Sequence, residues 1–408
     1  MSRIDELIAE LAPDGVRYVE TARLFDLRNG YTPSKSNTSF WSDGTIPWFR
    51  MEDLRANGGV LDRALQQIPE VAVKGGRLFP ANSLLVATSA TIGEHALVTV
   101  PHLSNQRFTS LSVKPEYAEQ IDMKFIYYYG FVLDEWCRNN TSTSSFASVD
   151  MTGFKKFRFP LPPLEVQREI VRMLDRFTQL KAELEAELVA RRRQYEHYRQ
   201  IEMSFDDSVS RVQLGDVVEV RSGWGFPNAH QGQSVGEYPF YKVSDMNLLG
   251  NETVMSRANH FVSEEVAKKL GVRPAPAGTI IFPKIGAAVA TNKKRVLSVA
   301  SAYDNNVMGL IPTERIDSRY LYHWIQTFDL SRLANDSGAV PSIRKSEAER
   351  VPIPLPGIAV QRRIVDKLDR FDALVNDLSV GLPAELAARS RQYEYYRDRL
   401  LTFEEAMA

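Results

Sequence analysis

An internal duplication is the feature that most constrains how this chain can fold. Residues 160–177 read PLPPLEVQREIVRMLDRF and residues 354–371 read PLPGIAVQRRIVDKLDRF, with 12 of the 18 aligned positions identical. A second match, RRQYEHYR at 192–199 against SRQYEYYR at 390–397, lies four residues further along in the second copy. Because the first match has an offset of 194 residues, the period is far too long for a solenoid repeat. The sequence therefore predicts one structural unit made twice.

The part of each copy that precedes these matches is predicted to be a mixed α and β domain. IPWFRMEDL at 46–54 lies opposite YPFYKVSDM at 238–246, so the duplication extends into these regions. Short apolar runs at 83–87 and 279–282, bounded by Gly, Pro and Asn, indicate buried strands. Two further segments, 123–136 and 318–330, each predict a helix.

The well-matched segments predict two long helices that pair with each other. In the first copy Ile170, Leu174 and Phe177 are spaced by four and three residues, as in a coiled coil, and the second copy repeats the pattern. Two equivalent helices related by a pseudo-two-fold axis perpendicular to their length run antiparallel. Roughly 37 residues at ~1.5 Å rise make a rod of about 55 Å. Gly381 and Pro383 are expected to interrupt the second helix.

The expected fold class is therefore α+β, with two mixed α/β domains separated by an antiparallel pair of long coiled-coil helices and related as a pseudo-two-fold internal repeat. The expected boundaries are 1–158 for the first domain, 159–203 for the first helical spacer, 204–352 for the second domain and 353–403 for the second spacer.

Several classes of protein are excluded by what the sequence lacks. Cys137 is the single cysteine, which rules out an internal disulfide and a multi-cysteine metal site. The first residues, MSRIDE, are not a secretory signal, and no uninterrupted apolar run reaches the length of a membrane span. A cytoplasmic protein without membrane contact is expected. The chain also has no phosphate-binding loop, no His-Glu-x-x-His motif and no Asn/Asp-Pro-Pro-Tyr/Phe loop for adenine methylation.

The charge balance limits how the chain could bind nucleic acid. Fifty Lys and Arg stand against 51 Asp and Glu, and the balance is also even within 1–159 (17 and 18) and within 205–353 (17 and 16). No domain is basic overall, so DNA binding would need local patches and base contacts as well as phosphate contacts.

The duplicated PLPPLEVQREIV and RRQYEHYR segments and the tail YYRDRLLTF at 395–403 resemble the DNA-specificity subunit of type I restriction-modification systems. The resemblance covers essentially the whole chain. It implies two target-recognition domains on a helical spacer, with no catalysis in this chain. It further implies double-stranded DNA, two modification subunits and two restriction subunits as partners. No cofactor is expected here, whereas the partner subunits would use S-adenosylmethionine, ATP and Mg²⁺.

Candidate DNA-binding residues lie on polar loops of both domains, where turn residues accompany side chains able to bond base edges or phosphates. In the first domain they are Arg28, Ser34, Lys35, Asn37, Arg50, Thr88, Ser89, Gln106 and Arg107. In the second domain they are Arg221, Asn228, Lys242, Lys284, Lys293, Lys294, Arg295, Asn305, Asn306, Arg344 and Lys345. The two sets differ while the helices match, which favours two readers of different half-sites on one scaffold.

Candidate partner-binding residues lie on the helices. They are Gln167, Arg168, Arg172, Arg176, Gln361 and Arg362. For each charged residue a solvated helix face is the alternative. Three other readings of the whole chain stay open: the specificity subunit of an orphan, methylation-only adenine methyltransferase complex, a stand-alone nuclease or methyltransferase, and a scaffold that does not read sequence.

Overall fold

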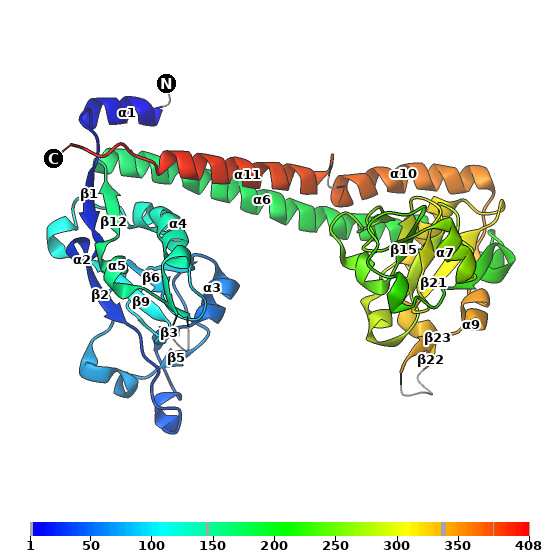
Figure 1. Ribbon diagram of the computed structural model, residues 1–408, viewed down its shortest axis with the longest axis horizontal. Coiled ribbons are helices and arrows are strands. Elements are labelled where there is room, and N and C mark those ends of the chain that lie inside the picture. The colour runs from blue at the N-terminus through cyan, green and yellow to red at the C-terminus, as the bar shows by residue number, and fades with distance from the viewer. Residues whose placement is uncertain (1–2, 144–146, 336–339, 378, 408) are drawn as a thin grey trace. The chain divides into compact units, whose positions relative to one another are not determined.

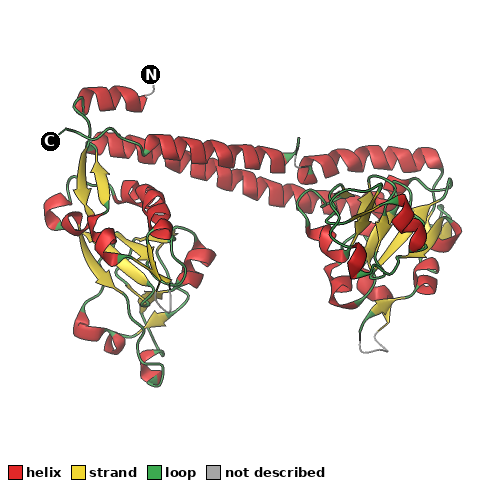
Figure 2. Cartoon of the chain, viewed as in Figure 1, coloured by secondary structure: helices red, strands yellow, loops and turns green. Residues whose placement is uncertain are grey.

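The chain forms two compact units, each built from parts that are distant in the sequence. The computed structural model describes residues 3–143, 147–335, 340–377 and 379–407. Unit 1 contains residues 1–180 and 390–408, and unit 2 contains residues 181–389. In each unit, strands and short helices pack beside segments of the long helices (Figures 1 and 2). The mixed α and β composition predicted from the sequence is confirmed.

Unit 1 contains a larger sheet in the strand order β2-β9-β6-β7-β4 and a smaller one in the order β5-β3-β8. The central strand β6, Ser83–Ala87, is buried along its whole length, which explains its apolar sequence. The other strands of the two sheets are β2 (Phe25–Asn29), β3 (Ile46–Phe49), β4 (Val60–Leu61), β5 (Gln67–Ile68), β7 (His95–Val98), β8 (Leu103–Ser104) and β9 (Phe108–Val113). Short pairs complete the unit: β1 (Arg17–Glu20) with β12 (Arg158–Leu161), and β10 (Thr141–Thr143) with β11 (Ala147–Val149).

Unit 2 repeats this topology strand for strand. Its sheets have the orders β14-β21-β18-β19-β16 and β17-β15-β20. The register repeats as well, because Leu84 pairs with Leu111 in unit 1 and Ile280 pairs with Leu310 in unit 2. The strands are β13 (Arg211–Gln213), β14 (Val218–Ser222), β15 (Tyr238–Tyr241), β16 (Val254–Met255), β17 (Phe261–Val262), β18 (Ile280–Pro283), β19 (Arg295–Leu297), β20 (Ala302–Tyr303), β21 (Val307–Pro312), β22 (Ala334–Asn335), β23 (Ser342–Ile343) and β24 (Pro352–Pro354).

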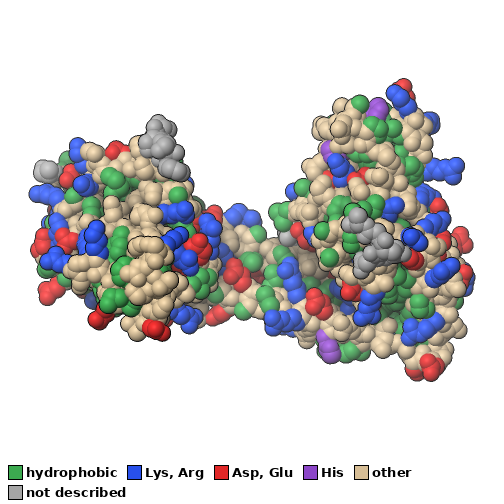
Figure 3. All heavy atoms as spheres, turned by 90° about the horizontal axis from the view of Figure 1, so that it is seen from below, with side chains coloured by type: hydrophobic (Ala, Val, Ile, Leu, Met, Phe, Trp, Pro, Cys, Tyr) green, Lys and Arg blue, Asp and Glu red, His purple; other side chains and the backbone are tan. Residues whose placement is uncertain are grey.

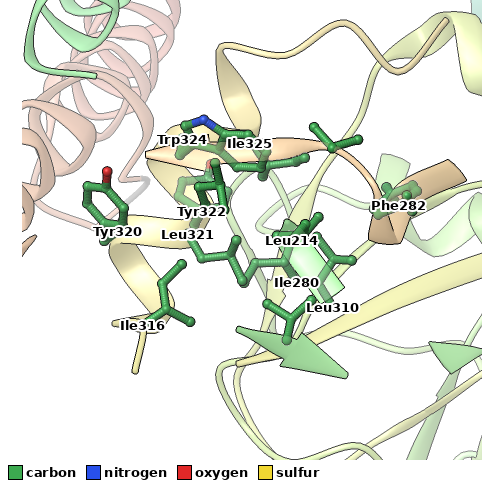
Figure 4. Packing of buried hydrophobic residues seen from close by; sticks show 14 of the residues in the cluster. Leu214, Ile280, Phe282, Leu310, Ile316, Tyr320, Leu321, Tyr322, Trp324 and Ile325 are labelled. Carbon is green, nitrogen blue, oxygen red and sulfur yellow. The ribbon is translucent and has the colours of Figure 1, made fainter. Parts of the chain in front are cut away.

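One helix packs against the larger sheet at equivalent places, α4 (Met123–Asn139) in unit 1 and α8 (Ser318–Gln326) in unit 2. Each begins with an aspartate that caps it: Asp122 accepts from the backbone N–H of Lys124 and Asp317 from that of Arg319, both at 2.8 Å. Figure 4 shows Leu321 and other side chains of α8 facing Ile280 and Leu310 in the core of unit 2. The helix predicted over 318–330 ends earlier, at Gln326, because Asp329 caps a separate 3₁₀ turn.

The two units contain further α-helices besides α4, α8 and the long helices. They are α1 (Arg3–Leu11), α2 (Thr21–Leu24), α3 (Met51–Asn57) and α5 (Met151–Lys156) in unit 1, and α7 (Glu264–Lys269) and α9 (Lys345–Glu349) in unit 2. In the part of the chain that the structure describes, no helix is long and apolar enough to cross a membrane.

The long helices of the two copies pair as predicted. α6 is one helix, Leu164–Glu202, and the second copy supplies α10 (Ile358–Asn376) and α11 (Leu382–Leu400). In unit 1, Phe177 of α6 stacks on Tyr396 of α11 with ring centres 5.5 Å apart. In unit 2, α6 runs antiparallel to α10, as the following contacts show: Glu202 with Lys367, Tyr198 with Phe371, and Arg192 with the carbonyl of Val375.

The predicted interruption separates α10 from α11. Gly381 donates its N–H to the carbonyl of Asp377. A Cβ atom at Gly381 would lie 2.4 Å from the carbonyl oxygen of Ala373, so only glycine fits against the end of α10. α6 has no such break and is continuous for 39 residues, about 58 Å at helical rise.

Candidate nucleic-acid interface

In unit 1, a tight turn between β8 and β9 presents two of the predicted DNA-binding residues. The Asn105 side chain accepts a hydrogen bond of 3.0 Å from the backbone N–H of Arg107, which fixes the turn. The side chains of Gln106 and Arg107 are exposed at its tip.

The loop that follows β2 lies against this turn. Tyr31 donates its backbone N–H to the carbonyl of Ser104 at 2.8 Å. A Cβ atom at Gly30 would lie 2.1 Å from the carbonyl oxygen of Asn105, so this approach requires glycine. The Thr32 hydroxyl donates to Oε1 of Gln106 at 2.5 Å and joins the two segments through side chains. Among the predicted residues of this loop, Ser34, Lys35 and Asn37 are exposed.

Arg50 is held at a third segment, where β3 ends and α3 begins. Its backbone N–H donates to Oδ2 of Asp53 at 2.6 Å, and the other oxygen of this buried carboxylate accepts from the N–H of Leu65. The Arg50 guanidinium lies 5.8 Å from the ring centre of Trp48. Together the three segments line a hollow of about 690 Å³ that includes Thr32, Lys35, Trp41, Trp48, Arg50, Gln106 and Arg107. The structure thus brings four predicted DNA-binding residues to one concave surface.

Unit 2 builds the same framework from different side chains. Asp304 accepts from the backbone N–H of Asn306 at 3.0 Å, as Asn105 does from Arg107. A Cβ atom at Gly223 would lie 1.9 Å from the carbonyl oxygen of Asp304. Lys242 takes the place of Arg50, since its N–H donates to buried Asp245 at 2.7 Å.

The residues that directly follow strands β6 and β18 can be compared in the same way. The backbone N–H groups of Thr88 and Lys284 donate to the carbonyls of Arg107 and Asn306, both at 2.9 Å, so these residues are also equivalent. Thr88 is buried and bonds Thr109, whereas the Lys284 ammonium donates to the Ser222 hydroxyl at 3.0 Å. Burial lowers the pKa of Lys284. Next to this position, Ser89 pairs with Ser148 in an isolated antiparallel β-bridge.

The structure also describes five other predicted residues, and the side chains of Arg28, Arg221 and Lys345 have partners of their own. Arg28 donates to the carbonyls of Arg77 and Leu78, and Arg221 pairs with Glu219 at 2.7 Å. Lys345 pairs with Glu349, and Arg344 is exposed at the start of α9. Asn228 begins an exposed 3₁₀ turn. Arg28 and Arg221 therefore also hold neighbouring chain segments in place.

The predicted basic cluster at 293–295 is not an exposed cluster, and this corrects the prediction. Lys294 has no exposed surface, and its ammonium donates to Asn292 and to the carbonyl of Phe328, both at 2.7 Å. Burial lowers its pKa to about 7. Arg295 is half-buried and bonds backbone carbonyls, while Lys293 bonds the side chain of Asn247. Arg295 is the first residue of β19, so the sheet includes part of the basic run.

The prediction that Gln167 and Gln361 bind partners is also wrong, because both side chains are buried. Oε1 of Gln167 accepts from the N–H of Asp122, and its Nε2 donates to the carbonyls of Gln120 and Pro162. Gln361 makes the same three bonds in unit 2, to Asp317, Arg315 and Pro356. Each glutamine joins the start of a long helix to the cap of α4 or α8. The other four, Arg168, Arg172, Arg176 and Arg362, are exposed.

Sequence reasoning missed the residues that build the framework. They are Gly30 and Gly223, Asp53 and Asp245, and Asn105 and Asp304. Each pair stands at matching positions of the two copies, for example in FRMEDL and YKVSDM. Aligning the repeat for shared Gly and Asp, rather than for basic residues, would have found the first two pairs, whereas Asn105 and Asp304 differ in identity.

The face of the protein shown in Figure 3 carries Lys and Arg side chains interspersed with Asp and Glu over both units. No large area of a single charge is visible on that face, which agrees with the even charge balance of the sequence.

Comparison with known proteins agrees with the duplicated framework. The family model described as "Type I restriction modification DNA specificity domain" matches twice, at residues 13–190 and 207–388. The chain is 41% identical over 382 residues to the EcoprrI specificity subunit of Escherichia coli, covering 89% of each chain. It is 32% identical over 300 residues to the EcoR124I/EcoR124II specificity subunit of E. coli, covering 69% of this chain and 71% of that one.

Solved structures share the fold at low sequence identity. A chain from a structural study titled for complex assembly and conformational transition of the type I R-M system aligns with a TM-score of 0.65 at 17% identity, covering 95% of this chain and 97% of that one. The HsdS subunit from Thermoanaerobacter tengcongensis aligns with a TM-score of 0.50 at 17% identity, covering 95% and 96%. With two matches to the family model and a relative at 41% identity, the chain belongs to the family of DNA-specificity subunits of type I restriction-modification systems.

Proposed function

We propose that this chain reads a bipartite, asymmetric DNA sequence, with unit 1 reading one half and unit 2 the other. The single observation that carries the proposal is the shared framework with unlike exposed side chains: Gln106 and Arg107 in one unit, Asn305 and Asn306 in the other. A common framework gives two domains the same way of docking on DNA, while different donors and acceptors select different bases.

The long helices would set the gap between the two halves of the site. α6 is an uninterrupted helix that begins in unit 1 and ends in unit 2, and such an element resists bending. Four residues inserted within 180–190 would lengthen it by about 6 Å, close to two base pairs. Such a variant is expected to keep both half-sites and to widen the unread gap.

The chain would contribute recognition and positioning, and its partners the chemistry. Two modification subunits using S-adenosylmethionine would methylate adenine N6, and two restriction subunits using ATP and Mg²⁺ would cleave. The four exposed arginines of α6 and α10 are the proposed docking side chains, because they are charged and lie on helix faces turned to solvent. They are Arg168, Arg172, Arg176 and Arg362.

The test is to express the chain with its modification subunit in a methylation-free host and to sequence the methylome with long reads. A motif with two specified parts and a fixed gap is expected. A single contiguous motif would contradict the proposal, sequence-independent binding of the complex would favour a scaffold, and activity of the purified chain alone would favour a catalytic protein. Adding the restriction subunit then separates a restricting complex from a methylation-only one.

A further inference from the structure

The two matching turns single out one position in each unit. In both, the first residue of the turn binds the N–H of the third, so the second residue projects from a fixed backbone. That second residue is Gln106 in unit 1 and Asn305 in unit 2, and both are exposed. Two independent copies thus present a side-chain amide from the same place.

Three polar residues near these amides, Asn306, Arg50 and Lys242, are less free to bind. Nδ2 of Asn306 donates back to Asp304 at 3.2 Å, within its own turn. Arg50 lies over Trp48, and the Lys242 ammonium donates to Gln231 at 3.2 Å. By contrast, within the described residues the Nε2 group of Gln106 and the whole side chain of Asn305 have no hydrogen-bond partner.

Thr32 fixes the orientation of the Gln106 amide. Its hydroxyl donates to Oε1 of Gln106, which distinguishes the oxygen from the nitrogen and leaves Nε2 as the free donor. An amide oxygen has two lone pairs, so Oε1 can accept a second hydrogen bond. A donor and an acceptor side by side match N7 and N6 of adenine in the major groove, and the same holds for asparagine.

Resting on the proposed function, we propose that Gln106 and Asn305 are equivalent specificity-determining residues, each reading an adenine of its own half-site through a bidentate amide contact. Thr32 is a positioning residue for Gln106. Loss of either amide removes the preference for an A·T pair at one position of one half-site and leaves the other half unchanged.

The experiment uses the complex with the modification subunit. The wild-type motif is first defined by methylome sequencing, and a panel of duplexes then carries each of the four base pairs at every specified position in turn. Competition binding measures the preference at each position. A bidentate base contact predicts that Gln106→Ala lowers the preference for A·T by about 5- to 150-fold at one position only.

Three further variants sharpen the test. Asn305→Ala is expected to change one position in the opposite half-site. Gln106→Glu, which retains acceptors but loses the donor, is expected to shift the same position towards cytosine, whose N4 is a donor. Gln200→Ala, which removes an exposed amide from α6, is expected to leave every preference unchanged.

The outcomes separate this inference from the proposed function. If the wild-type complex prefers no sequence, the proposed function fails. If it has a defined motif and Gln106→Ala and Asn305→Ala leave every preference as it was, the proposed function stands and this inference is overturned. A change at several positions in both halves after Gln106→Ala would also overturn it. The binding panel gives an answer even where a variant no longer supports methylation.

Discussion

Each unit anchors its domain to a long helix through an aspartate at the equivalent position, but the side chains that donate to this aspartate differ. Asp175 on α6 accepts from the Lys124 ammonium at 2.6 Å and from the Tyr128 hydroxyl at 2.7 Å. Asp369 on α10 takes the same place in unit 2. There Arg319 and His323 replace the lysine and the tyrosine, each with a bond of 2.6 Å to Oδ1.

The difference lies in how deeply the network is buried. In unit 2, Arg319 also reaches Asp372 at 3.2 Å, and Tyr195 of α6 donates to Asp372 at 3.1 Å. Burial opposes ionisation of Asp369, but hydrogen bonds from His323 and Arg319 outweigh it and lower the pKa of the carboxyl. A repeat can therefore keep the position of an acceptor while the donors around it change, provided that the new donors still lie within hydrogen-bond distance of it.

The largest loss of stability is expected on replacing the buried glutamines, which are identical in the two units. Gln361→Ala leaves the N–H of Asp317 and the carbonyl of Pro356 without their partner in a buried place. Each buried group that loses its bond costs ~1–3 kcal/mol, so the free energy of unfolding of unit 2 should fall by about 3 kcal/mol. Gln167→Ala should do the same to unit 1. Calorimetry would resolve the two transitions, and a loss below about 1 kcal/mol in either would mean that the glutamine does not clamp its domain.

A smaller and unequal effect is expected at the anchors. Asp369 and Asp175 are similarly exposed, at 37% and 39%. The networks differ in their other members: the Arg319 side chain is 25% exposed and that of its second partner Asp372 only 9%, whereas the Lys124 side chain is 46% exposed. Breaking a buried pair leaves a charge without compensation, while an exposed pair contributes little. Arg319→Met should therefore destabilise unit 2 by about 2–3 kcal/mol, and Lys124→Met should destabilise unit 1 by at most about 1 kcal/mol. If urea unfolding showed that the two variants lose equal free energies of unfolding, the proposed difference between the two networks would be contradicted.

The third expected effect depends on pH and is confined to unit 2. His95 of unit 1 bonds Asp134 at 2.6 Å, and the equivalent strand position in unit 2 is Lys294, whose pKa burial lowers to about 7. In the unfolded chain lysine keeps its proton to about pH 10.4, so between these values the unfolded state binds more protons and the stability of unit 2 rises with pH.

Lys294→Met removes this contribution. Compared with the wild type, Lys294→Met should be stabilised by about 2 kcal/mol more at pH 7 than near pH 9. Thermal unfolding at the two pH values measures the difference, and Lys269→Met, an exposed lysine of α7, is the control. A difference that does not change with pH would show that Lys294 keeps its proton in the folded protein.

The sequence predicted the elements whose signal is local, and missed those that depend on the assembled unit. The strand at 83–87 and the helix break near Gly381 could be predicted because an apolar run and a glycine are visible in the local sequence. Gln361 and Lys294 were misread because a polar side chain reveals its burial only through partners distant in the sequence, such as Arg315 and Phe328. For the same reason the turn at Asn105 and its fit against Gly30 could be found only in three dimensions.

The smallest effect is expected at the aromatic stacks, where the two units are again alike. Tyr198 stacks on Phe371 at 5.4 Å and 22°, and Tyr396 stacks on Phe177 at 5.5 Å and 20°. An aromatic pair contributes ~0.5–1.5 kcal/mol beyond the area that it buries, so Tyr198→Leu and Tyr396→Leu should each cost about 1 kcal/mol or less. Because neither unit has an advantage in geometry, the two losses should agree within about 0.5 kcal/mol in denaturant unfolding. A clear inequality would show that the helix pair is not equally packed in the two units, and the symmetry drawn from the repeat would then hold for the sheets but not for the helices.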